Sequence, residues 1–208
     1  MFELFERGGL MMYPLLLASL IGLAYIIERG FALRKRKILN PEIIAIVKNF
    51  SSMNDLELAR SICLKQPGPL SNVIQLALDN HDLPHNELRE LLEDQGRQEV
   101  RELNRGLIVL ETTAAISPLM GLLGTVLGMV KVFDVIKDQG IGQTAALSGG
   151  ISEALLTTVT GLFIAIPILI AFYYFSKKSE NFILDIENYS NNLILKIKRI
   201  HLSTTKQS

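Results

Sequence analysis

The chain has 208 residues, equal numbers of acidic and basic side chains and a formal net charge of zero, yet 49% of its residues are apolar. The balanced charge gives no support for a nucleic-acid-binding protein, and the single cysteine, Cys63, excludes a disulfide within the chain. Three uncharged runs of 18, 19 and 23 residues, at 10–27, 112–130 and 154–176, exceed what a soluble domain of this length needs. About 20 apolar residues cross the hydrocarbon of a bilayer as a helix, so the sequence predicts three membrane spans.

The first run predicts a retained membrane helix over residues 10–28, preceded by a short tail at 1–9. It is too long for a signal peptide, and no basic segment precedes it. Five basic residues follow it (Arg29, Arg34, Lys35, Arg36, Lys37), whereas only Arg7 comes before it. The positive-inside rule then predicts a periplasmic N-terminus and, after three crossings, a cytoplasmic C-terminus. The predicted fold class is an all-α, multi-pass integral membrane protein.

Residues 29–106 predict a helical cytoplasmic region. Asn40 followed by Pro41 is a helix-start signal, and the apolar residues after it recur with helical spacing. Residues 93–106 are polar on almost all sides, which is typical of a helix that bridges through solvent. We therefore expect the second membrane helix to begin far out in the cytoplasm and to enter the membrane without a loop.

The remaining boundaries follow from the charge pattern. The second span is predicted at 107–133, a periplasmic connector at 134–150 and the third span at 151–176. Helical spacing of apolar residues continues through 177–208, so the third helix is expected to extend into the cytoplasm as well.

The second and third spans are unusually polar for segments that only cross lipid. They contain ISPLMGLLGTVLGM at 116–129 and GGISEALLTTVTGLFIAIP at 149–167. Hydroxyls and helix breakers gain nothing from acyl chains, so these segments are expected to face protein or water. Gly121, Gly124 and Gly128 form one stripe of the second span, which favours close approach of another helix and predicts a homo-oligomer. Generic packing and a pore-lining role are both open for this stripe.

Thr125 and Thr158 carry a sharper hypothesis. They lie 16 residues before and 17 residues after the centre of the connector near Ile141, which predicts a similar depth in the membrane. In an oligomer they would form a ring of hydroxyls. The alternative is that each hydroxyl donates to a carbonyl of its own helix.

Acidic residues lie only near the ends of these spans. Glu111 is predicted at the cytoplasmic end of the second span and Glu153 at the outer end of the third, where either could instead snorkel or cap. The middle of each span has no Asp, Glu, His, Lys or Arg, so this chain supplies no titratable relay there. Pro118 and Pro167 each fall inside a span, which predicts a kink that serves either packing or gating.

The sequence gives little support for an enzyme. His81 and His85 have the spacing of a metal pair, but Pro84 between them breaks the helix that would bring them to one face. Solvated loop residues are the favoured interpretation, and no metal or cofactor is expected. An intramembrane hydrolase would need an acid pair or a serine with a histidine inside the spans, and the spans contain no histidine.

The two quoted segments resemble the signature segments of the MotA/TolQ/ExbB proton channel family. The similarity covers about residues 111–175, and three spans with a cytoplasmic insert after the first resemble its ExbB/TolQ branch. The Mot-type members have four spans and fit less well. The resemblance implies a homopentamer in the bacterial inner membrane around a dimer of an ExbD- or TolR-like single-span protein, whose membrane aspartate is the protonatable group.

The resemblance also implies roles for particular residues. Thr125 and Thr158 correspond to pore-lining threonines, Glu153 to an acid at the pore mouth and Pro118 to a helix kink, while Gly161 belongs to the same motif. The adjacent Thr157 could take the place of Thr158, and Glu111 stands where a small or apolar residue is expected. The implied function is to couple proton flow, or Na⁺ flow, to work on the cell envelope through a TonB- or TolA-like protein. A non-conducting membrane scaffold is the alternative.

Overall fold

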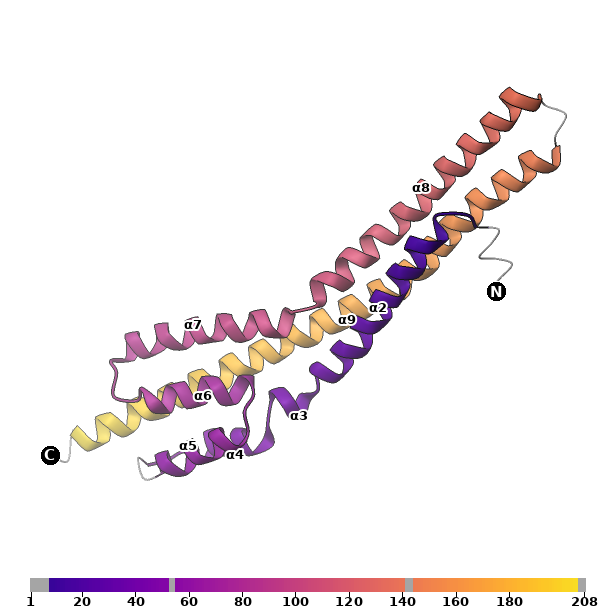
Figure 1. Cartoon of the computed structure of the whole chain (residues 1–208). Helices are drawn as coiled ribbons and strands as arrows, with labels where there is room; N and C mark the ends of the chain where they lie inside the picture. The colour runs from indigo at the N-terminus through magenta and orange to yellow at the C-terminus, as the bar shows by residue number, and fades with distance from the viewer. Residues whose placement is uncertain (1–7, 53–54, 141–143, 206–208) are drawn as a thin grey trace. The chain divides into compact units, whose positions relative to one another are not determined.

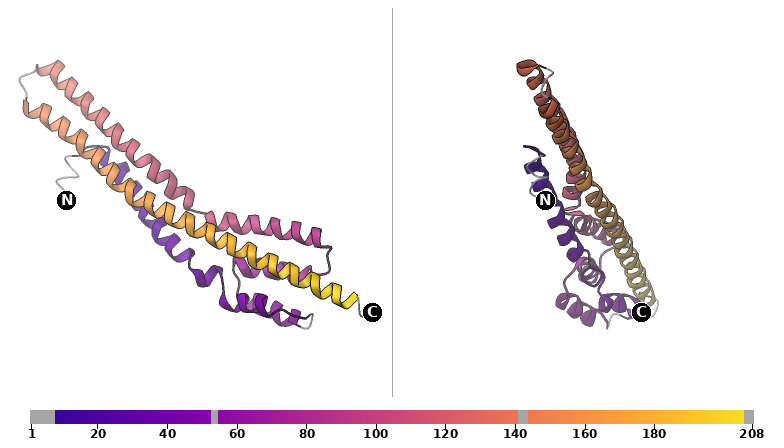
Figure 2. Two further views of the ribbon diagram at one scale, coloured as in Figure 1. Left: turned by 180° about the vertical axis from the view of Figure 1, so that it is seen from behind. Right: turned by 90° about the vertical axis from the view of Figure 1, so that its right-hand side faces the viewer.

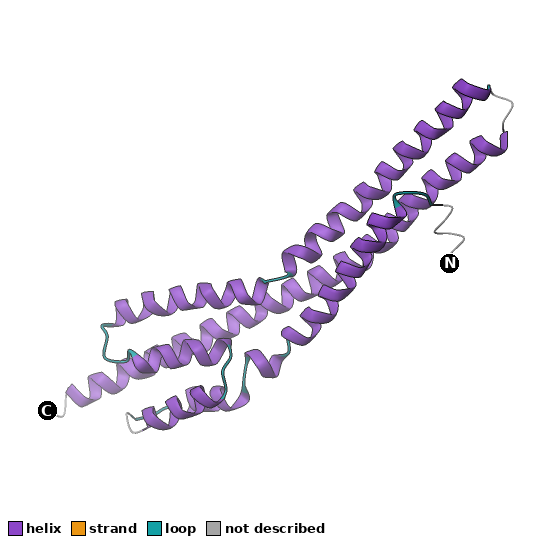
Figure 3. Ribbon diagram, in the orientation of Figure 1, coloured by secondary structure: helices purple, strands orange, loops and turns teal. Residues whose placement is uncertain are grey.

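The computed structural model describes residues 8–52, 55–140 and 144–205, and these residues contain helices and no strand (Figure 3). The all-α prediction is therefore confirmed for the described part of the chain. The helices, labelled in Figure 1, are α2 (Met12–Ala32), α3 (Lys35–Ile38), α4 (Pro41–Asn49), α5 (Leu56–Lys65), α6 (Pro69–Asp79), α7 (His85–Asn104), α8 (Leu107–Gln139) and α9 (Thr144–Thr205).

Three of these helices are long and apolar enough to cross a membrane. The candidate spans are Met12–Ala32, Leu107–Asp138 and a segment within Leu147–Ile200, with mean hydropathies of 1.7, 1.9 and 2.4. Each of them overlaps one of the three predicted spans. The predicted connector at 134–150 contains the end of α8 at Gln139 and the start of α9 at Thr144, and its residues 141–143 lie outside the described part of the chain.

The chain divides into two compact units. Unit 1 comprises Met1–Arg29 and Gly106–Tyr174, and unit 2 comprises Gly30–Arg105 and Phe175–Ser208. The chain passes between the units after Arg29, Arg105 and Tyr174, and each of these three positions lies close to a predicted end of a membrane span. Each unit has its own packing, and the helix α9 contributes its first part to unit 1 and its last part to unit 2.

Unit 1 contains most of α2, all of α8 and the first part of α9. The helices α8 and α9 run side by side as a hairpin, and α2 lies beside α9 (Figures 1 and 2). Gly22 of α2 allows a close approach, since a Cβ atom there would meet the side chains of Ile168 in α9 and Thr113 in α8. A glycine in the first span thus lets α2 contact both helices of the hairpin.

The expected unbroken helix leading into the second span is wrong. The helix α7 ends at Asn104 and α8 begins at Leu107, with Arg105 extended and Gly106 in the left-handed region at φ +82°. Glycine adopts that conformation without steric cost, so Gly106 ends the helical run. The expected extension of the third helix beyond its span is present, because α9 continues unbroken to Thr205.

Unit 2 has a core of aliphatic residues. Its most buried side chains include Ile43, Leu70, Ile74, Leu78 and Leu193, each with no exposed surface. The predicted helix start is confirmed: the Asn40 side chain accepts a hydrogen bond of 2.9 Å from the Glu42 amide, and Pro41 occupies the first turn of α4.

A lysine of α9 secures the other end of α4. The Lys196 ammonium donates hydrogen bonds to the carbonyl of Val47 at 2.9 Å and to that of Lys48 at 2.5 Å. Because the last carbonyls of a helix have no partner within it, a cation at this end both satisfies them and complements the helix dipole. Residues about 150 positions apart in the sequence are joined in this way.

Candidate functional site

The glycine stripe of α8 packs against α9 of the same chain. A Cβ atom on Gly121 would lie 2.9 Å from the Thr157 carbonyl, and one on Gly128 would lie 2.8 Å from Ala154 Cβ. A Cβ atom on Gly124 would collide with the Thr157 side chain. The stripe therefore brings two helices of one protomer together, and it does not by itself require a second copy of the chain.

Gly161 provides the complementary contact from α9. A Cβ atom there would lie 2.6 Å from the carbonyl oxygen of Ser117 and 3.2 Å from the Cα atom of Gly121. Ser117 is completely buried, and its hydroxyl donates to the Thr113 carbonyl at 2.7 Å. The two helix backbones can approach this closely only because Gly121 and Gly161 have no side chain.

The two adjacent threonines of α9 have different environments. Thr157 is 1% exposed, and its hydroxyl donates to the Ala154 carbonyl at 2.8 Å, with the Gly121 carbonyl at 3.5 Å. Thr158 is half-buried and donates to the Gly121 carbonyl at 3.1 Å. Thr157 is thus enclosed between α8 and α9, whereas Thr158 retains an accessible surface.

Thr125 is also half-buried, and its hydroxyl donates to the Leu122 carbonyl of its own helix at 2.6 Å. This is the intrahelical bonding that the sequence left open as an alternative, although the acceptor is three residues away and not four. Thr158 binds Gly121, one turn from Thr125, so the two hydroxyls lie within about one turn of the same level of the hairpin.

Both prolines lie inside helices that continue past them. Pro118 is half-buried in α8 and Pro167 is exposed on α9. A proline has no N–H to donate, so the carbonyl oxygens of Ala114 and Phe163, four residues earlier, lose their usual helical partner. Phe163 is 78% exposed, so one of the two carbonyls without a helical partner lies on an outer face of the unit.

The two acidic residues at the span ends differ in their contacts. The Glu153 carboxylate forms an ion pair of 2.6 Å with the Lys131 ammonium of α8, and its side chain is 22% exposed. Glu111 is exposed on α8 and has no hydrogen bond or ion pair with the described residues. No role was assigned to Lys131 from the sequence. Its position on the helix antiparallel to Glu153 could have suggested the pair.

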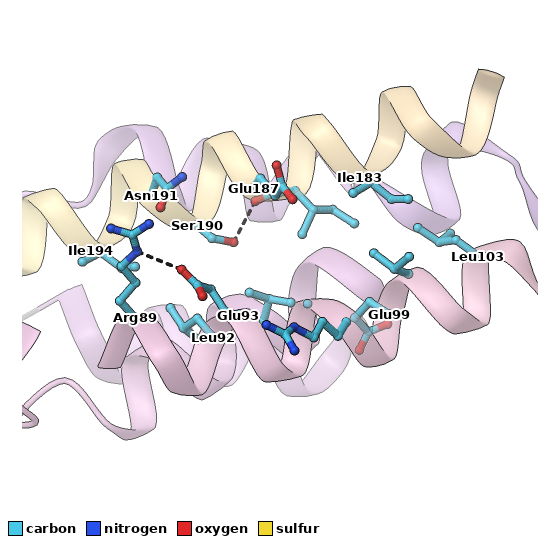
Figure 4. A pocket seen from close by; sticks show the side chains of 15 residues that line it. Arg89, Leu92, Glu93, Glu99, Leu103, Ile183, Glu187, Ser190, Asn191 and Ile194 are labelled. Atoms are coloured by element: carbon cyan, nitrogen blue, oxygen red, sulfur yellow. Dashed lines mark hydrogen bonds and ion pairs between the residues drawn. The ribbon is translucent and has the colours of Figure 1, made fainter. Parts of the chain in front are cut away.

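Unit 2 contains an open cavity of about 400 Å³ between α7 and α9 (Figure 4). It lies where Gly96 leaves space, because a Cβ atom there would meet nothing within 4 Å. Three of its charged side chains have partners: Arg89 pairs with Glu93 at 2.9 Å, and the buried Glu99 accepts hydrogen bonds from two amide side chains. None of the predicted site residues lines this cavity.

The two histidines do not form a metal site among the described residues, where no group of three His, Cys, Asp or Glu side chains could hold a metal ion. His81 contacts the Leu78 carbonyl at 2.9 Å and Asp82 at 3.1 Å, while His85 opens α7. Cys63 is buried, and burial raises the pKa of its thiol above the ordinary value.

Comparison with known proteins places these features in a family. The model of the MotA/TolQ/ExbB proton channel family matches residues 65–188 of this chain. The ExbB-like 3 biopolymer transport protein of Synechocystis sp. is 34% identical over 175 residues, covering 78% of this chain and 79% of that protein. ExbB of Neisseria meningitidis serogroup B is 26% identical over 198 residues and 88% of each chain.

The fold is similar to that of the solved C. jejuni MotAB structure. The TM-score is 0.52 with 21% sequence identity, over 88% of this chain and 73% of that one. The family match covers the glycine stripe, both threonines, both prolines and the Lys131–Glu153 pair. The chain therefore belongs to the MotA/TolQ/ExbB proton channel family, and its relatives place it with the ExbB-like members.

Proposed function

We propose that the chain is the channel-forming subunit of an energy-transducing complex of the ExbB–ExbD or TolQ–TolR type in a bacterial inner membrane. Five copies would surround two single-span partner helices, with the N-terminus in the periplasm and the C-terminus in the cytoplasm. Proton flow would drive relative motion of the channel and its partner. The family consists of ion-channel motor subunits and not of enzymes, which agrees with this role.

One observation carries the proposal: the hairpin offers hydroxyls to an ion but no titratable group in mid-span. No charged residue or histidine occurs between Glu111 and Lys131 in α8 or between Glu153 and Lys177 in α9. A proton cannot be relayed across that distance by threonine side chains alone. The protonatable group must then come from a second chain, and the membrane aspartate of an ExbD- or TolR-like partner would supply it.

The contacts within unit 1 support Thr158 over Thr157 as a pathway residue. Thr157 is enclosed between helices of its own protomer, while Thr158 and Thr125 each keep an accessible surface. The glycine stripe is also occupied within the protomer. Contacts with other copies and with the partner would therefore use the outer faces of the hairpin, where residues such as Leu122, Val126 and Leu155 are more than half exposed.

The energy available is sufficient for mechanical coupling. Each elementary charge that crosses the membrane releases about 2.3 kcal/mol per 100 mV of potential, enough to bias a small rotation or translation of helices. We propose that a TonB- or TolA-like protein receives this work. Protons are the proposed ion, and replacing them with Na⁺ in a flux assay separates the two alternatives.

The test replaces both accessible hydroxyls with methyl groups, as Thr125→Val with Thr158→Val, in the complex purified with its partner. Ion flux into liposomes should fall at least tenfold while the complex still assembles, because the shapes are alike and only hydrogen-bonding capacity is lost. Thr160→Val is the matched control, since it makes the same substitution on α9, two residues from Thr158, at a hydroxyl that is not assigned to the pathway and that donates to the Leu156 carbonyl at 2.8 Å. Full flux in the double variant would refute the assignment.

A non-conducting scaffold is the alternative function. It predicts the same packing of the hairpin but no ion flux in any variant. The native mass of the gently solubilised complex, together with its co-purifying proteins, separates the two. Five copies of this chain with two copies of a single-span protein that has a membrane Asp support the channel, whereas a complex without such a partner supports the scaffold.

A further inference from the structure

The carboxylate of Glu153, in α9, is enclosed by two other segments of unit 1. The Lys131 ammonium approaches it from α8 at 2.6 Å, and the turn before α2 covers it from another side. Gly9 in that turn has φ +66°, and a Cβ atom there would collide with the Glu153 carboxylate. The side chain of Glu153 is consequently 22% exposed, although it lies near the end of a membrane span.

The hairpin places the lysine and the glutamate at the same level. Lys131 lies eight residues before the last residue of α8, Gln139, and Glu153 lies nine residues after the first residue of α9, Thr144. At about 1.5 Å per residue both positions are about 12–14 Å from the helix ends that flank the turn. The pair therefore joins the two helices directly, on the turn side of the level of Thr125 and Thr158.

This ion pair differs from another lysine–glutamate pair with a similar distance between nitrogen and oxygen. Lys177 and Glu180 are 2.7 Å apart, but they lie three residues apart on one exposed helix face, where a pair contributes little. Glu153 has less than half the exposure of Lys131, at 22% against 57%. Removing the lysine would leave a largely buried carboxylate without its counter-charge, which is much costlier than losing an exposed pair.

We propose that Lys131 is the positioning residue for Glu153: it holds that carboxylate against α8 at the outer end of the ion pathway. The inference rests on the proposed channel function only for the role of Glu153 in ion flow, and the pairing itself can be tested separately. Lys131 forms the ion pair with Glu153, while Gly9 approaches the carboxylate without a side chain. Asp134 lies one turn beyond Lys131 on α8 and is exposed.

The pairing is tested by chemical modification of the full complex in detergent. Lys131 should be acetylated by acetic anhydride at least threefold more slowly in the wild type than in Glu153→Gln, because the paired ammonium is less available to the reagent. Lys137, exposed on the same helix, is the internal reference and should react equally in both proteins. Equal rates at Lys131 would overturn the proposal, whatever the complex conducts.

The functional consequence is tested by ion flux in liposomes. Lys131→Met should lower flux by about tenfold, and Lys131→Arg should stay within about twofold of the wild type, because the longer cation can still pair. In the Glu153→Gln background, Lys131→Met should cause no further loss, since the lysine acts through the glutamate. Lys177→Met is the matched control and should leave flux unchanged.

Two results would refute a positioning role. One is an equal loss of flux from Lys131→Met with and without Glu153, which would mean that the lysine acts independently. The other is failure of Lys131→Arg to retain flux while the melting temperatures of both lysine variants stay at the wild-type value. If no variant and no wild-type complex conducts, the proposed function fails, and the acetylation rates still decide whether the pair exists.

Discussion

The two units of this chain pack by opposite rules. In unit 1 the closest contacts between helices are made by small residues, and many large apolar side chains are exposed, among them Leu119, Phe133 and Phe163. In unit 2 large aliphatic side chains form the core, and charged residues cover the outside. The helix α9 follows the first rule in its first part and the second rule in its last part.

The difference has a physical cause. In water, burying a Leu or Ile side chain gains about 1.5–3 kcal/mol, so unit 2 places these residues inside. In a bilayer the lipid is as apolar as the side chains, so burial gains little and helices associate through close backbone contact. Exposed leucines in unit 1 are therefore the expected lipid-facing or subunit-facing surface, and the contact-forming residues are Gly, Ser, Thr and Ala.

The largest effect is expected from a cavity in the core of unit 2. Leu193→Ala removes a side chain with no exposed surface and should destabilise unit 2 by about 2–5 kcal/mol. Leu195→Ala, two residues further along the same helix, removes a side chain that is 50% exposed and should cost much less. Thermal unfolding of the two variants in detergent gives the comparison. Equal shifts would contradict an aqueous-type core in unit 2.

A smaller effect is expected from the backbone contact in unit 1. Gly161→Ala places a methyl group 2.6 Å from the Ser117 carbonyl and should destabilise the hairpin by about 1–3 kcal/mol. Gly149→Ala is the control on the same helix, because a Cβ atom there meets nothing within 4 Å. It should be neutral or stabilise the helix by up to about 1 kcal/mol. A lower melting temperature for Gly161→Ala and an unchanged or higher one for Gly149→Ala would support packing of unit 1 through small residues. An unchanged melting temperature for Gly161→Ala would contradict it.

The smallest effect on stability is the pH-dependent contribution of the Cys63 thiol in unit 2. Burial raises the pKa of its thiol, with a further increase from the Asp79 carboxylate, while a hydrogen bond with Ser71 opposes the shift. Because the folded-state pKa lies above that of the unfolded chain, the resulting stabilisation is fully present below the unfolded value. It is lost as the pH rises through the folded-state pKa.

The measurement is the rate of alkylation by iodoacetamide at pH 8, in the folded protein and in denaturant. The folded protein should react more than tenfold more slowly, since both the thiolate fraction and the access to it are reduced. Equal rates in the two conditions would show that the core around Cys63 is open.

Much of the site could be anticipated from local patterns. Residue spacing and charge identified the spans, and the two motif segments indicated the family that the comparisons then showed. Two features could not be anticipated. The partner of the glycine stripe depends on which helix lies opposite, and the end of α7 depends on one left-handed residue, Gly106, in a sequence that is otherwise strongly helical.

The three apolar spans, the Asn40–Pro41 helix start and the lack of a charged residue or histidine in mid-span can all be read from single segments, because each depends on residue type and spacing along one segment. Two other features come from the packing of α8 against α9: Thr157 is enclosed while Thr158 is accessible, and Lys131 pairs with Glu153 across 22 positions. These facts depend on the rotation and register of two helices against each other. Close glycine contacts fix both, and no single segment encodes them.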